Sequence, residues 1–252
     1  MPASLFLALV LLPQLVDKTT QPPAPPPTAT RLSPEARADI YMARKMYREA
    51  LETYQEALRQ NPKSYVLYNK LGIAYHQQGQ LHLDQAQRNY ERSVKLNKKY
   101  AEAINNLGTI YYARKQYRRA ISIYNRALRL SPNSASIHSN LGTAFFSRKK
   151  YKEASEHYAT ALKLDPEVFE HRSSFGSLLQ ERTVEDRARF HYYMAKTYAA
   201  AGYVDRAIAY LRKALEEGLK DREKIPAEAE FASLRDNPEF KELIAGNVPV
   251  IP

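Results

Sequence analysis

The sequence predicts an all-α protein built from repeated helix pairs, and three observations support this. First, an alanine recurs at intervals of 36, 34 and 34 residues, as Ala50, Ala86, Ala120 and Ala154. Second, a tyrosine follows each alanine four residues later and a small residue follows after three more, so each string forms one face of a helix. Third, helix-favouring patterns run through the middle of this 252-residue chain, with no strand pattern. A fixed period of this length indicates a helical array.

A second helix-forming string that contains a glycine precedes the second, third and fourth alanine strings. Glycine inside a helix costs about 1 kcal/mol relative to alanine, so we expect a neighbouring helix to approach closely there. The strings are Leu71, Gly72 and Tyr75, then Leu107, Gly108 and Tyr111, then Leu141, Gly142 and Phe145. Each repeat is therefore predicted to be a pair of helices.

These landmarks resemble the tetratricopeptide repeat (TPR) family, whose 34-residue unit carries L-G, Y, A, F/Y, A and P at the same offsets. The resemblance, as to a bacterial TPR protein, implies a right-handed α-solenoid of TPR helix-turn-helix repeats. It places four repeats in residues 31–168 and a further repeat in residues 188–221. The further repeat is carried by Met194, Ala195, Tyr198, Gly202, Ala207, Leu211 and Ala214.

Three departures from the pattern lead to local predictions. The first repeat has Arg37 and Ala38 in place of leucine and glycine, which suits a terminal repeat. The second repeat has two extra residues within 80–83, which should lengthen the turn between its helices. Residues 169–187 exceed the repeat length and are predicted to be an irregular insertion, in which either a helix or a loop remains open.

The two ends of the chain differ from the repeats. Residues 222–252 are predicted to form capping helices and a tail, with Asn237 capping the last helix and Pro238 opening it. Residues 1–30 combine a signal-like apolar segment with a proline-rich linker that contains five prolines and no charge. They predict export to the periplasm or cell envelope, with membrane proximity through the N-terminus. The alternative is a cytoplasmic protein with an apolar tail.

No pattern of catalytic or metal-binding residues is found in the sequence. Cysteine is absent, which excludes disulfides, thiol catalysis and cysteine-based zinc sites. The six histidines lack metal-ligand spacing, and no glycine-rich phosphate loop or nucleophile motif is present. The sequence therefore predicts a non-catalytic protein with no cofactor and no metal.

The net charge of +11 supports an alternative function, because basic proteins often bind nucleic acid or anionic membrane. Much of this charge lies in the second and third repeats. Arg118, Arg119, Arg126 and Arg129 fall between the apolar positions of one helix and should therefore lie on its outer face. Basic-surface binding to nucleic acid or anionic membrane is the alternative to a protein-binding role.

The resemblance to TPR proteins implies a concave groove that binds a protein or peptide partner and is lined by the first helix of each repeat. Asn106 and Asn140 match an asparagine ladder that bonds the backbone of an extended peptide in some members, although they could merely solvate the groove. As exposed amides, both could become alanine without loss of stability. Glu35 and Asp39 occupy positions of a basic carboxylate clamp, so binding of a chaperone tail is not expected. The predicted groove residues are Lys70, Asn106, Thr109, Tyr112, Asn140, Thr143 and Phe146.

Overall fold

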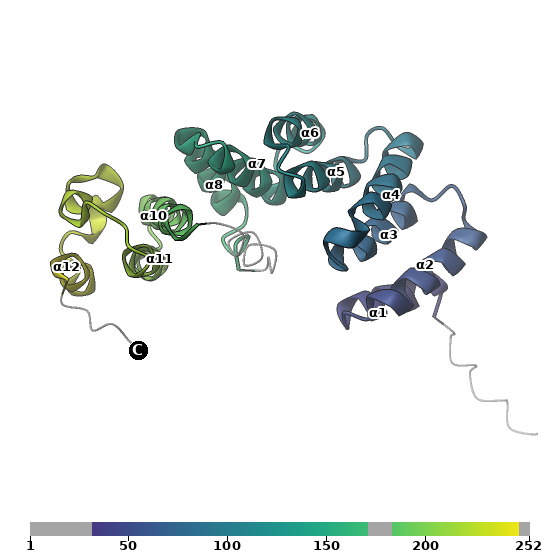
Figure 1. Cartoon of the computed structure of the whole chain (residues 1–252), viewed down its shortest axis with the longest axis horizontal. Helices are drawn as coiled ribbons and strands as arrows, with labels where there is room; N and C mark the ends of the chain where they lie inside the picture. The colour runs from purple at the N-terminus through teal and green to yellow at the C-terminus, as the bar shows by residue number, and fades with distance from the viewer. Residues whose placement is uncertain (1–31, 171–182, 247–252) are drawn as a thin grey trace, which may run out of the picture.

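The computed structural model describes residues 32–170 and 183–246, in which helices follow one another in pairs along a curved row (Figure 1). No strand occurs within these ranges, so the predicted all-α solenoid is confirmed. The pairs are α1 (Pro34–Ala43) with α2 (Tyr47–Gln60), α3 (Tyr65–Gln77) with α4 (Leu83–Leu96), α5 (Ala101–Ala113) with α6 (Tyr117–Leu130), α7 (Ala135–Ser147) with α8 (Tyr151–Leu164), and α10 (Val184–Ala200) with α11 (Val204–Glu216).

The repeated glycines lie where a tyrosine ring from the second helix of the pair covers the first helix. A Cβ atom added to Gly72 would lie 2.6 Å from the ring of Tyr90, and one added to Gly142 would lie 2.5 Å from the ring of Tyr158. These separations are far below van der Waals contact, so only glycine fits beneath the ring. The close approach that the sequence predicts is therefore confirmed.

The turns between paired helices use left-handed backbone. Lys45, Lys115 and Lys149 have φ values of 58°, 59° and 60°, and Gly79 and Gly202 have positive φ at the corresponding turns. In the second repeat the extra residues form a short 3₁₀ helix, η1 (Gln80–His82), which lengthens the turn as predicted.

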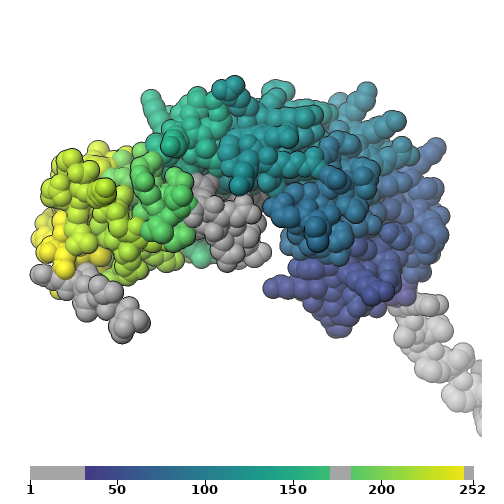
Figure 2. Space-filling view, viewed as in Figure 1, coloured from purple at the N-terminus to yellow at the C-terminus, as the bar shows by residue number. Residues whose placement is uncertain are grey.

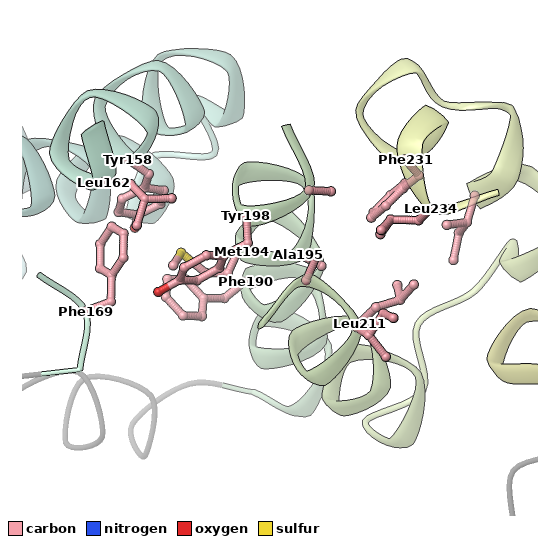
Figure 3. Close-up of a cluster of buried hydrophobic side chains, with 14 of the residues drawn as sticks. Tyr158, Leu162, Phe169, Phe190, Met194, Ala195, Tyr198, Leu211, Phe231 and Leu234 are labelled. Carbon is pink, nitrogen blue, oxygen red and sulfur yellow. The ribbon is translucent and has the colours of Figure 1, made fainter. Parts of the chain in front are cut away.

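The C-terminal part of the array is held by one cluster of buried side chains contributed by α8, α10, α11 and η3 (Ala229–Leu234), shown in Figure 3. Phe169, in the turn after α8, packs edge-on against Tyr158 and Tyr198. The cap itself comprises η2 (Arg222–Ala227), η3 and α12 (Pro238–Ala245). The Asn237 side chain accepts a hydrogen bond from the Phe240 backbone N–H at 3.0 Å, which confirms the predicted cap of α12.

One predicted boundary differs from the structure. Helix α10 begins at Val184, so the end of the segment predicted as irregular, 169–187, is helical. Thr183 caps this helix by accepting from the Asp186 backbone N–H, and two acidic residues follow in the first turn, which favours an early start. The signal-like segment and linker at 1–30 and most of the insertion lie outside the described residues.

Among the described residues, no helix is long and apolar enough to cross a membrane. The space-filling view shows the curved outline of the array, with a hollow on one side (Figure 2). The first helices of successive repeats contact one another directly, α3 with α5 and α5 with α7, and contacts between successive second helices are weaker or absent. Because the more closely spaced layer of a curved array lies on its inside, α1, α3, α5 and α7 form the inner face.

Candidate functional site

At its N-terminal end, the inner face carries a cluster of partly buried ion pairs. The Lys70 ammonium of α3 donates to Glu35 and to Asp39 of α1, each at 2.7 Å. Asp39 also accepts from the Tyr54 hydroxyl at 2.6 Å. Burial alone would lower the pKa of Lys70, but the bonds to Asp39 and Glu35 outweigh it and raise the pKa. Lys70 therefore links two repeats.

Side-chain amides continue this linkage along the inner face. Asn106 of α5 donates to the Asn69 side-chain oxygen at 3.0 Å, and Asn69 donates to Glu102 at 2.9 Å. One repeat further along, Asn140 of α7 donates to the Asn105 side-chain oxygen at 2.8 Å. These bonds form a polar ladder that joins α3 to α5 and α5 to α7.

The ladder corrects the expectation that Asn106 and Asn140 carry freely exposed amides. Each donates to an amide that is almost fully buried, since Asn69 is 1% exposed and Asn105 is 6% exposed. Sequence reasoning missed Asn69 and Asn105, each of which lies one residue before a predicted position. The available signal was that Asn69 and Asn105 recur at the repeat spacing.

Thr109 and Tyr112 occupy the centre of the inner face and are half-buried. The Thr109 hydroxyl donates to the Asn106 backbone carbonyl at 2.7 Å and lies 3.5 Å from His76 Nδ1. The Tyr112 hydroxyl lies 2.8 Å from the Ser147 hydroxyl of α7. This part of the face therefore presents partly exposed side chains whose positions are fixed by neighbouring helices.

The predicted groove residues on α7 do not all lie on an open surface. Thr143 is 5% exposed, and its hydroxyl accepts from Tyr158 at 3.3 Å. Phe146 is 2% exposed and contacts Phe190 and Tyr193 of α10. The prediction that Phe146 lines an open groove is wrong, because α10 packs against this end of α7 and covers the ring.

The histidines suit packing better than metal ligation. No group of His, Cys, Asp and Glu suited to a metal ion occurs in the described ranges. His138 Nε2 donates to the Pro132 carbonyl at 3.1 Å, which leaves its Nδ1 to accept from His157 Nδ1 at 3.0 Å. The His157 ring also stacks on Phe145, with centroids 5.4 Å apart. Since one of the two facing Nδ1 atoms must accept, the two rings cannot both carry a proton at Nδ1.

We expect the free energy of unfolding to fall as pH falls from about 7.5 to about 5. Burial lowers the pKa of His157, with His138 lowering it further, and burial also lowers the pKa values of His76 and His191. Their unfolded pKa, about 6.5, lies above the folded values, so the unfolded chain binds more protons in acid. Urea denaturation at several pH values should show a smaller fall for His157→Gln. An identical pH dependence in that variant would contradict this account.

Comparison with known proteins identifies the repeats independently. A tetratricopeptide repeat model matches residues 64–133 and 100–167, a TPR repeat model matches residues 38–79, and a further tetratricopeptide repeat model matches residues 188–217. Among curated proteins, the photosystem I assembly protein Ycf3 of Rippkaea orientalis (strain PCC 8801 / RF-1) is 40% identical over 70 residues. That match covers 26% of this chain and 39% of the relative, so the chain spans well under half of the relative's length.

The solved structure of a TPR protein shows the same fold. TTC0263, a thermophilic TPR protein from Thermus thermophilus, is 21% identical with a TM-score of 0.52, covering 80% of this chain and 97% of that chain. MamA from Desulfovibrio magneticus RS-1 is 18% identical with a TM-score of 0.49, covering 75% and 94% of the two chains. The matched repeats and the helix pairs coincide along the array, and the chain belongs to the tetratricopeptide repeat family.

Proposed function

We propose that this protein is a non-catalytic scaffold that binds a peptide or protein partner along its inner face. TPR proteins mediate protein–protein interaction and are typically non-catalytic. The observation that carries the proposal is the polar ladder, because it holds partly exposed side chains in place on one continuous face of three successive repeats.

Such preorganisation favours binding. A side chain that is already fixed loses less conformational entropy when a partner binds. Asn106 is half-buried, and its bond to Asn69 uses one of the two amide hydrogens. The second amide hydrogen can donate to a backbone carbonyl of an extended peptide, and the amide oxygen can accept from a backbone N–H. Thr109 and Tyr112 lie one and two turns further along the same helix.

Site-specific photo-crosslinking in the native host tests the proposal. Benzoylphenylalanine is placed at Thr109 on the inner face and, as a matched control, at Ser122 on the outer face of α6. We expect a discrete adduct with one protein from position 109 and none from position 122. An adduct formed only at position 122 would place the partner on the outer face instead.

Binding of nucleic acid or anionic membrane is the second candidate, favoured by the net charge of +11. Purely electrostatic binding that uses six or more phosphate contacts weakens by orders of magnitude between about 50 and 200 mM salt. We therefore propose that any binding of a generic oligonucleotide is weak and is lost near physiological salt. Tight binding that persists at that salt concentration would favour the second candidate.

We also propose that residues 1–30 direct export, on the basis of their apolar run and proline-rich linker. A fusion of these residues to a reporter that is active only outside the cytoplasm should give signal. Leu9→Arg should abolish the signal, because a charge within a short apolar core opposes membrane insertion. A silent wild-type fusion would contradict export.

A further inference from the structure

A shallow, strongly basic cavity lies at the edge of the array, where α5 turns into α6 and α7 ends nearby. Its volume is about 400 Å³. In the described part of the chain, no carboxylate forms an ion pair with Arg118, Arg119 or Arg148 within 4.0 Å. The residues lining the cavity are Lys115, Gln116, Tyr117, Arg118, Arg119 and Arg148.

The preceding repeat shows which chemical group pairs with the arginine equivalent to Arg148. There, Arg114 at the end of α5 forms an ion pair with Asp84 in the first turn of α4 and donates to Gln87 at 2.6 Å. Arg148 lies 34 residues after Arg114, and Arg118 lies 34 residues after Asp84, so the same two positions recur with an arginine in place of the carboxylate. Both arginines line the cavity.

The charge of α6 is unusual among the second helices of the repeats. The first turns of α2, α4, α8 and α11 each contain an acidic residue, whereas the first turn of α6 contains none and carries Arg118 and Arg119. Cations at a helix N-terminus are unfavourable, and so are like charges brought together. An anion from outside the chain would relieve both effects.

We propose that this cavity binds an acidic segment of a protein partner through Arg118, Arg119 and Arg148. A carboxylate fills the equivalent position one repeat earlier, and guanidinium groups bind carboxylates in a paired, directional geometry. Arg119 lies over the Tyr111 ring at 4.1 Å and covers it, and no lining residue is an exposed large hydrophobic residue. The cavity therefore offers no exposed apolar group that would insert into lipid.

Arg118→Asp provides a test in which loss of binding is separated from loss of folding. It recreates the ion pair of the preceding repeat with Arg148 and places an acid in the first turn of α6, so Tm should rise by about 2 °C. A fluorescein-labelled peptide of eight alternating glutamate and serine residues serves as the probe, with fluorescence anisotropy in about 0.1 M salt as the readout. We expect its affinity to fall about tenfold or more in Arg118→Asp.

Arg129→Asp is the matched control, because it makes the same charge change on the same helix. Eleven residues of helix separate the two positions by about 16 Å, beyond the screening length of about 10 Å at 0.1 M salt. At that salt concentration, the control should bind the peptide as the wild type does. Equal loss in both variants would overturn the proposal, since it would reflect net charge alone.

A generic oligonucleotide and vesicles containing anionic phospholipid complete the experiment. Binding of either probe that depends on Arg118, with no such dependence for the acidic peptide, would overturn the proposal in favour of a phosphate ligand. The cavity does not include Thr109 or Asn106, so variants of these inner-face residues should leave binding of the acidic peptide unchanged. Failure of the acidic-segment proposal is thereby distinguished from failure of the proposed inner-face binding.

Discussion

Gly108→Val should lower the free energy of unfolding by about 3 kcal/mol. The ring of Tyr124 lies directly over Gly108, and Tyr124 is almost fully buried, so the ring cannot move aside into solvent. A valine adds three carbon atoms where even one does not fit, and its branched side chain is also unfavourable in a helix. Urea denaturation followed by circular dichroism measures the change.

Thr109→Val is the matched control for this substitution. It introduces the same side chain at the next position of the same helix, where the wild-type residue is already β-branched and half-buried. Its cost should stay near 1 kcal/mol, the value of the hydroxyl bond to the Asn106 carbonyl. If Gly108→Val were no more destabilising than this control, close packing of the ring on the glycine would not hold the helix pair together.

Asn106→Ala combined with Asn140→Ala should lower the free energy of unfolding by about 2–4 kcal/mol. The two substitutions remove the donors to the Asn69 and Asn105 side-chain oxygens, which belong to buried residues. An unsatisfied buried acceptor costs about 1–3 kcal/mol, and the higher helix propensity of alanine recovers only a part of this. Urea denaturation again measures the loss.

Gln77→Ala is the control for the ladder, since Gln77 is an exposed amide at the end of α3. Its effect should stay within about 0.5 kcal/mol, as for most surface substitutions. Unchanged stability of the double asparagine variant would mean that the two amides face solvent, as the sequence alone had suggested.

The architecture was predictable because it depends on local, periodic features of the sequence. The recurrence of Ala50, Ala86, Ala120 and Ala154 marks the buried seam of each second helix, and all four side chains are fully buried. Each repeat packs mainly on its neighbours, so a pattern that is read one unit at a time also specifies the array.

The arrangement of the candidate binding face was harder to predict, because it depends on side-chain partners in adjacent repeats. The resemblance to TPR proteins placed Asn106 on the inner face, but it could not show that the Asn106 amide would bond to Asn69 rather than point outward. The burial of Phe146 depends on how α10 packs after an insertion whose length breaks the period. Both outcomes are set by packing across repeats.

The proposal that the partner binds on the inner face is tested most directly by the affinity of the crosslinked partner for two arginine variants. Thr109→Arg and Ser122→Arg make the same charge change on the two helices of one repeat, one on the inner face and one on the outer face. With the partner purified, isothermal titration should show binding weakened about tenfold or more by Thr109→Arg and unchanged by Ser122→Arg, with both variants folded. Normal affinity for Thr109→Arg together with lost affinity for Ser122→Arg would contradict binding on the inner face.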